Sequence, residues 1–133
     1  MLDFVCGISK PRADALRKAG LPVPTPINLK GLVDTGASIT CIDPSVLKSL
    51  GVVSTGAIPL HTPSTKPGIP HFANEFDISF ALVHPQTTRT WFALRVIEAE
   101  LAHQGIHALV GRDILQSCLM TYDGQAGTFA LGF

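Results

Sequence analysis

The sequence is poor in charged residues, which make up 15% of its 133 residues, whereas about 25% is usual in soluble domains. Lys+Arg 10 balance Asp+Glu 10, so the formal net charge is zero, and no basic run is present. A protein that binds nucleic acid carries a basic face that neutralises phosphates. We therefore expect no nucleic-acid partner, and a surface with so few charges favours a protein partner.

Long apolar runs and paired cysteines are also missing. No stretch reaches the roughly 18 uninterrupted apolar residues of a membrane helix, and no basic-then-apolar signal pattern opens the chain. We expect no membrane contact for this segment. Cys6, Cys41 and Cys118 lie far apart without a C-x-x-C spacing, which indicates reduced core thiols and favours a cytoplasmic location.

Glycine and proline are plentiful, with 12 and 10 residues, and they divide a chain of single-domain length into short segments. We expect one domain over residues 1–133, all-β in class. Helix signals predict a short helix that starts at Ser9 and ends at Gly20, a second over Ser45–Leu50 with Asp43 as its cap, and a third over Gly111–Cys118. The predicted strands are Leu2–Ile8, Asn28–Val33, Ser38–Ile42, Ala57–His61, Phe72–Leu82, Thr87–Ile97, Ile106–Val110, Leu119–Tyr122 and Thr128–Phe133.

The most informative motif is Leu32-Val33-Asp34-Thr35-Gly36-Ala37-Ser38. An acid directly after an apolar strand, followed by a hydroxyl residue and a glycine, places a carboxylate where the backbone can turn tightly. A simpler interpretation is a turn acid that accepts hydrogen bonds from its own backbone. An Asp-Thr-Gly tripeptide alone occurs by chance in roughly one chain in forty of this length, so it is a weak signal by itself.

A second motif repeats the scheme of apolar strand, glycine and short helix: Ala108-Leu109-Val110-Gly111-Arg112-Asp113-Ile114-Leu115. The two motifs, in this order and at this separation, resemble those of the retropepsin-like aspartic proteases, in a form like the bacterial members. The resemblance runs from about Asn28 to Phe133. It implies a closed acid-protease barrel with one or two short helices, in which one chain supplies half of an active site.

The resemblance implies an aspartic endopeptidase whose catalytic residues are Asp34, Thr35 and Gly36. Hydrolysis by carboxylates needs one ionised group to activate water and one protonated group to donate to the carbonyl oxygen, a division that two acids about 3 Å apart achieve by sharing a proton. This chain has a single Asp-Thr-Gly. We therefore expect a homodimer that hydrolyses a peptide or protein substrate with water held between two Asp34 carboxylates, without cofactor or metal.

Neighbouring positions take their expected roles from the family. Thr35 would hydrogen-bond across the dimer, and Gly36 would lie beside the substrate backbone. The residues expected to line the substrate site are Ala37, Ser38, Leu109 and Val110, although the last two would serve equally as core residues. Because Ala37 lacks the hydroxyl that pepsin-like enzymes direct at the carboxylate, we expect a milder acid optimum than pepsin's.

Arg112 and the chain end are expected to serve structure and dimerisation. In viral relatives this arginine pairs with an acid at the position of Ser38, so here Arg112 either binds backbone carbonyls or another acid, or lies solvated at the surface. Phe129, Leu131 and Phe133 would belong to an interface strand. The flap that covers a retropepsin cleft corresponds by position to His61, Thr62, Pro63, Ser64, Thr65, Lys66, Pro67 and Gly68, a Pro-rich segment.

Two alternatives remain at this point. A non-catalytic dimerisation or peptide-binding module would explain the Pro-rich flap candidate and Ser38, but gives no reason for an intact Asp-Thr-Gly. A monomeric β domain with a metal at His103 and His107 is more remote: the four-residue spacing would place both on one helical face, but Gly105 between them breaks such a helix.

Overall fold

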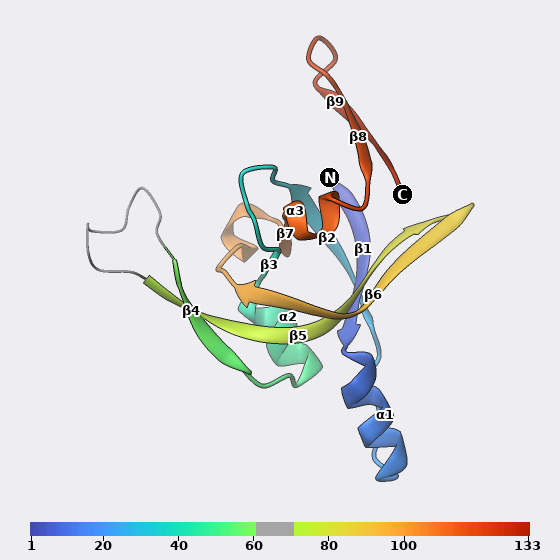
Figure 1. The fold of residues 1–133 in the computed structure, drawn as a ribbon, viewed down its shortest axis with the longest axis vertical. Coiled ribbons are helices and arrows are strands. Elements are labelled where there is room, and N and C mark those ends of the chain that lie inside the picture. Colours follow the sequence, from blue (N-terminus) through green and yellow to red (C-terminus); the bar gives the residue numbers. More distant parts are fainter. Residues whose placement is uncertain (61–70) are drawn as a thin grey trace.

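The computed structural model describes residues 1–60 and 71–133, which form a mainly β domain (Figure 1). The strands are β1 (Leu2–Ile8), β2 (Ile27–Val33), β3 (Cys41–Ile42), β4 (Gly56–Leu60), β5 (His71–His84), β6 (Thr87–Glu98), β7 (Ala108–Val110), β8 (Leu119–Asp123) and β9 (Thr128–Gly132). The helical elements are α1 (Lys10–Lys18), α2 (Pro44–Leu50), the 3-10 turn η1 (Ala102–Gln104) and α3 (Arg112–Leu115).

Seven of these strands form one sheet in the order β1-β2-β7-β3-β6-β5-β4. β1 also pairs antiparallel with β5, so six strands close into a barrel and β4 continues from β5 as an edge strand. The pairs β2–β7 and β3–β6 are parallel and the other pairs are antiparallel, which makes the barrel mixed. The predicted all-β, closed architecture is confirmed.

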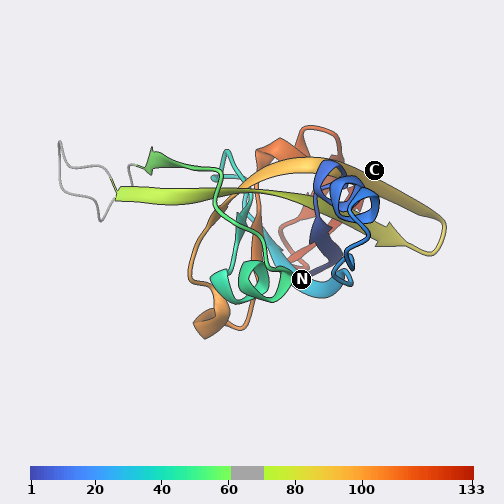
Figure 2. The ribbon, with the colours of Figure 1, turned by 90° about the horizontal axis from the view of Figure 1, so that it is seen from below.

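The long strand β5 links two ends of the molecule. Figure 2 shows the arm of β4 and β5 at one end of this strand and the β5–β6 turn at the other. Alternation along β5 directs Ile78, Phe80 and Leu82 to the barrel interior, where none of them retains exposed surface. The rings of Phe4 and Phe80 stack there with centroids 4.4 Å apart. β1 and β5 therefore close the barrel through its core as well as through their hydrogen bonds.

The helices are short, and two begin at the predicted caps, Ser9 and Asp43. The helix predicted over Gly111–Cys118 is only the single turn α3, because the N–H groups of Ser117 and Cys118 donate to carbonyls three residues back instead of four. In residues 1–60 and 71–133, no helix is both long and apolar enough to cross a membrane.

The predicted terminal hairpin is present but lies outside the barrel. β8 and β9 pair only with each other in the described part of the chain, and the hairpin projects away from the barrel in Figure 1. Leu119 and Tyr122 of β8 are 76% and 68% exposed. A lone two-stranded hairpin is marginally stable in water, so this element has apolar surface that its own chain leaves uncovered.

Candidate active site

The two sequence motifs meet because β2 and β7 are parallel neighbours. Leu32 is opposite Leu109 and Val33 is opposite Val110 in the register of this pair. The backbone N–H of Asp34 continues the ladder by donating to the Val110 carbonyl at 3.0 Å. Beyond this point both strands leave the sheet, so the Asp-Thr-Gly loop after β2 and the helix α3 after β7 are neighbours at the same end of the barrel.

The Asp34 carboxylate is half-buried at the start of an exposed loop. The Gly36 N–H donates to Asp34 Oδ1 at 2.9 Å, and the Ala37 N–H donates to the Asp34 carbonyl at 3.2 Å. A Cβ at position 36 would lie 3.2 Å from Asp34 Oδ1, closer than an ordinary contact. Glycine at position 36 therefore avoids a close contact with the Asp34 carboxylate and donates its N–H to it. Thr35 and Ser38 of the same loop are exposed.

The second motif is joined to the segment after this loop by a hydrogen-bond network around Thr40, which has no exposed surface. Its Oγ1 donates to Asp113 Oδ1 at 2.7 Å, its N–H donates to Asp113 Oδ2 at 2.9 Å, and its Oγ1 accepts the Gly111 N–H at 3.1 Å. A Cβ at position 111 would lie 2.9 Å from the Ala37 carbonyl oxygen. The two segments are thus packed backbone against backbone.

Arg112 joins the same two segments. Its N–H donates to the Ala37 carbonyl at 2.9 Å, and its Nη1 donates to the Thr35 carbonyl at 2.8 Å. Of the possibilities left open by the sequence, the structure shows the backbone-carbonyl contact. Two members of this network, Thr40 and Asp113, were not among the predicted site residues, although Asp113 lies in the second motif. No local sequence pattern indicates that Thr40 contacts Asp113.

The surface next to Asp34 is apolar, and of the two roles expected for Val110 the structure shows the one in the core. Val110 has no exposed surface, because alternation along β7 directs it into the barrel, so it is a core residue and does not line an open cleft. Leu109 on the other face is partly exposed, and its neighbour Leu32 is 47% exposed. Leu32 was not among the predicted site residues. Its position two residues before Asp34 could have predicted it, because residues two apart on a strand share a face.

The remaining predicted site residues lie apart from the Asp34 loop. Phe129, Leu131 and Phe133 line a cavity of about 490 Å³ together with Met1 and Leu2, between the hairpin and the start of β1. The flap candidates, positions 61–68, are outside the described residues.

The histidine pair offers no common ligand face. η1 ends before Gly105, whose φ of 75° breaks the helix, and His103 lies on η1 while His107 follows it. His107 Nδ1 instead accepts the Lys30 N–H at 3.4 Å. Within the described ranges, no group of three or more His, Cys, Asp or Glu side chains is arranged to hold a metal ion.

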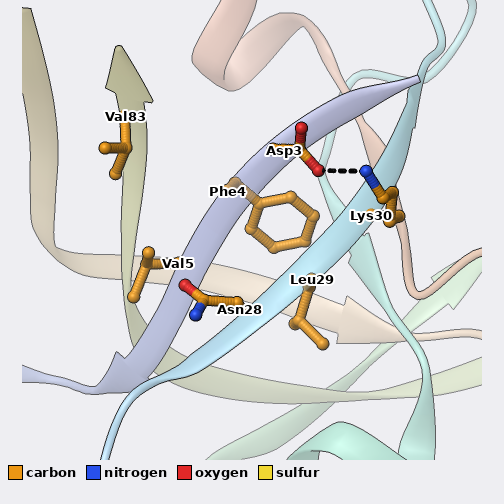
Figure 3. A pocket seen from close by; sticks show the side chains of 7 residues that line it. All are labelled: Asp3, Phe4, Val5, Asn28, Leu29, Lys30 and Val83. Atoms are coloured by element: carbon orange, nitrogen blue, oxygen red, sulfur yellow. Dashed lines mark hydrogen bonds and ion pairs between the residues drawn. The ribbon is translucent and has the colours of Figure 1, made fainter. Parts of the chain in front are cut away.

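Two further cavities differ in their relation to the motifs. One of about 400 Å³ lies over β1 and β2 beside the ion pair of Asp3 and Lys30, and no motif residue lines it (Figure 3). The other, of about 820 Å³, includes Cys41 of β3. Burial, and then the negative charges of Asp113 and Asp34, raise the pKa of the Cys41 thiol to about 11. Cys41 is opposite Leu109, and Leu109 is opposite Leu32, two residues before Asp34, so this second cavity begins two strands away from the strand that carries the candidate catalytic carboxylate.

No protein-family model and no curated protein matches the chain. Among solved structures, it is similar to the retroviral protease-like domain of Ddi1 from Leishmania major, with a TM-score of 0.46 and 15% sequence identity. The match covers 98% of this chain and 87% of that one. At this identity the likeness concerns the fold alone.

Proposed function

We propose that the chain is an aspartic endopeptidase that acts as a homodimer, with Asp34 of each subunit at the shared site. The observation that carries the proposal is the Asp34 loop itself: a half-buried carboxylate that accepts a backbone N–H and is braced by the second motif through Arg112 and Thr40. Such bracing holds a reacting group in place, which peptide hydrolysis requires.

In the proposed dimer the two Asp34 carboxylates approach to about 3 Å and share one proton. The ionised carboxylate takes a proton from water, whose oxygen attacks the carbonyl carbon of the substrate. The protonated carboxylate gives its proton to the carbonyl oxygen, which yields a tetrahedral diol intermediate. The carboxyl that received the water proton then gives it to the leaving nitrogen, the other carboxylate takes a proton from a hydroxyl of the intermediate, and the C–N bond breaks. Leu32, which is exposed, and Leu109, which is partly exposed, offer apolar surface beside the carboxylate to substrate side chains.

The hairpin of β8 and β9 supports the homodimer. It presents exposed Leu119, Tyr122 and Phe129 and packs little against its own barrel. Both of its outer edges carry unpaired strand hydrogen-bonding groups in the described chain, which a second copy can pair with. Covering this hairpin with its counterpart removes apolar surface from water and converts a marginal two-stranded element into a larger sheet.

A second candidate function is the non-catalytic peptide-binding or dimerisation module. The hydrogen bond from the Gly36 N–H to Asp34 Oδ1 favours it, because a simple turn acid makes the same bond. The two functions predict different behaviour when the carboxylate is replaced by the isosteric amide.

The test is cleavage of a diverse peptide library at about pH 5, a mild-acid condition suited to a carboxylate dyad, with wild type and Asp34→Asn compared. The proposal predicts cleavage by wild type alone, together with binding of a statine-type inhibitor that is lost in Asp34→Asn. Absence of cleavage by a wild-type protein shown to be dimeric by sedimentation would contradict the peptidase and favour the binding module.

A further inference from the structure

The cavity of about 820 Å³ is lined by apolar residues and by two acidic ones. It lies where β3, the arm of β4 and β5, and the end of β6 come together. Its lining includes the apolar Cys41, Leu60, Phe72 and Ile97 and the acidic Glu98 and Glu100. A long side chain with a methylene stem and a cationic head matches such a surface, because the stem lies on apolar walls while the head meets a carboxylate.

The cavity is within reach of a substrate held at Asp34. β2, β7 and β3 are consecutive in the sheet, with Leu32 opposite Leu109 and Leu109 opposite Cys41. Neighbouring strands are about 4.8 Å apart, so the Cys41 wall lies about 10 Å from Leu32, the span of about three residues of extended peptide. The effect of the Asp34 charge on the Cys41 thiol supports this proximity.

Within the described part of the chain, the two carboxylates have no cationic partner. None of the ion pairs between described residues uses Glu98 or Glu100. Asn74 Nδ2 donates to Glu98 Oε1 at 2.6 Å, so a neutral side chain of the adjacent strand positions this carboxylate. Charge-assisted hydrogen bonds to a lysine or arginine head are among the stronger polar contacts in proteins.

We infer that this cavity receives a lysine or arginine side chain of the peptide substrate, two or three residues from the scissile bond, with Glu98 and Glu100 binding its cationic head. The inference rests on the proposed peptidase function, because it takes Asp34 as the point of cleavage. It assigns Glu98 and Glu100 as specificity-determining residues and leaves the chemistry to Asp34.

The experiment uses matched peptides that differ only by Lys, Arg, norleucine or Glu at one position, scanned over the three residues on each side of the scissile bond. We expect wild type to prefer Lys or Arg over norleucine in kcat/KM by about tenfold at one position, and to lose part of this preference at high salt. Glu98→Gln/Glu100→Gln should bring the ratio close to one, and Glu98→Lys/Glu100→Lys should reverse it toward the Glu peptide.

Glu75→Gln is the matched control, since it removes one carboxylate from β5 at a residue that does not line the cavity, and it should keep the preference. Melting temperatures of all variants separate lost specificity from lost folding. Equal cleavage of the four peptides by wild type at every position would overturn the inference and leave the peptidase intact.

A protein that cleaves nothing is tested by binding instead. Fluorescence anisotropy with labelled Lys and Glu peptides then compares their affinities for wild type and for Asp34→Asn. Tighter binding of the Lys peptide, abolished by Glu98→Gln/Glu100→Gln, would support the acidic cavity while the peptidase fails. Equal binding of both peptides would overturn the cavity assignment as well.

Discussion

Thr40 Oγ1 donates a 2.7 Å hydrogen bond to Asp113 Oδ1, and this contact couples the loop after β2 to the helix after β7 across 73 positions of sequence. The same hydroxyl accepts the buried N–H of Gly111. One fully buried side chain therefore joins the segment that follows the Asp34 loop to the second motif.

Thr40→Val keeps the shape of this side chain and removes its hydroxyl. The Gly111 N–H then has no acceptor and Asp113 loses a donor, so the free energy of unfolding should fall by about 1–3 kcal/mol. Denaturant unfolding measures the change. Thr55→Val is the control, since Thr55 is exposed and its hydroxyl makes only a long 3.4 Å contact with the Glu75 carbonyl; a comparable loss in both variants would contradict the role of Thr40.

Leu32 and Val110 lie near each other on adjacent strands but on opposite faces. Leu32→Ala should lower kcat/KM with little loss of stability, because Leu32 is 47% exposed. Val110→Ala should instead lower the free energy of unfolding by about 2 kcal/mol, because Val110 is fully buried. Peptide cleavage and thermal unfolding of both variants are the measurements. The reverse pattern would contradict the assignment of these two faces.

The comparison of Leu32 with Val110 shows what the sequence could predict. Apolar runs ending at Asp34 and Gly111 were enough to predict two strand ends, and the family resemblance was enough to bring them together. The face of each side chain needs the register: the sequence left Val110 either in the cleft or in the core, and alternation along β7 places it in the core.

Contacts between distant positions could not be predicted in the same way. The barrel closes because β1 pairs with β5 from Phe4↔Leu82 to Ile8↔Ile78, and local patterns carry no information about that register. The contact of Thr40 with Asp113 has the same origin. By contrast, the capping signal at Asp43 acts over a few neighbouring residues, and α2 begins where it predicts.

Asp43 should govern part of the acid stability. Burial would raise the pKa of its carboxyl, but hydrogen bonds from the Ser45 side chain and from the backbone N–H groups of Leu101, Ser45 and Ala102 outweigh burial and lower the pKa to about 2. Since the folded pKa is depressed, the contribution is complete above the ordinary Asp value and is lost as the pH falls from about 4 to about 2.

We therefore expect Asp43→Asn to destabilise the protein at pH 7 by about 2 kcal/mol and to flatten the loss of stability between about pH 4 and pH 2. Urea unfolding of wild type and Asp43→Asn, at pH 7 and between about pH 4 and pH 2, measures both effects. Asp77→Asn is the control, because Asp77 is an exposed partner of Arg95 at 3.6 Å and should contribute little. An unchanged pH profile in Asp43→Asn would count against the assignment.

The terminal hairpin should control the oligomeric state. Leu119→Ser/Tyr122→Ser removes two exposed apolar side chains of β8 without touching the barrel. Sedimentation equilibrium should show a dimer dissociation constant raised by at least about tenfold. Val53→Ser replaces a comparably exposed residue in the loop between α2 and β4 and should leave the dimer unchanged. Equal dimerisation of both variants would exclude the hairpin as the interface.

The central claim is that both Asp34 carboxylates of a dimer are needed to cleave a peptide. The most direct measurement is cleavage of one peptide by wild type mixed with increasing amounts of Asp34→Asn at constant total protein, after subunit exchange. If each site needs both carboxylates, mixed dimers are inactive and the rate falls with the square of the wild-type fraction. A rate that falls in direct proportion to that fraction, or cleavage by Asp34→Asn alone, would contradict the shared site.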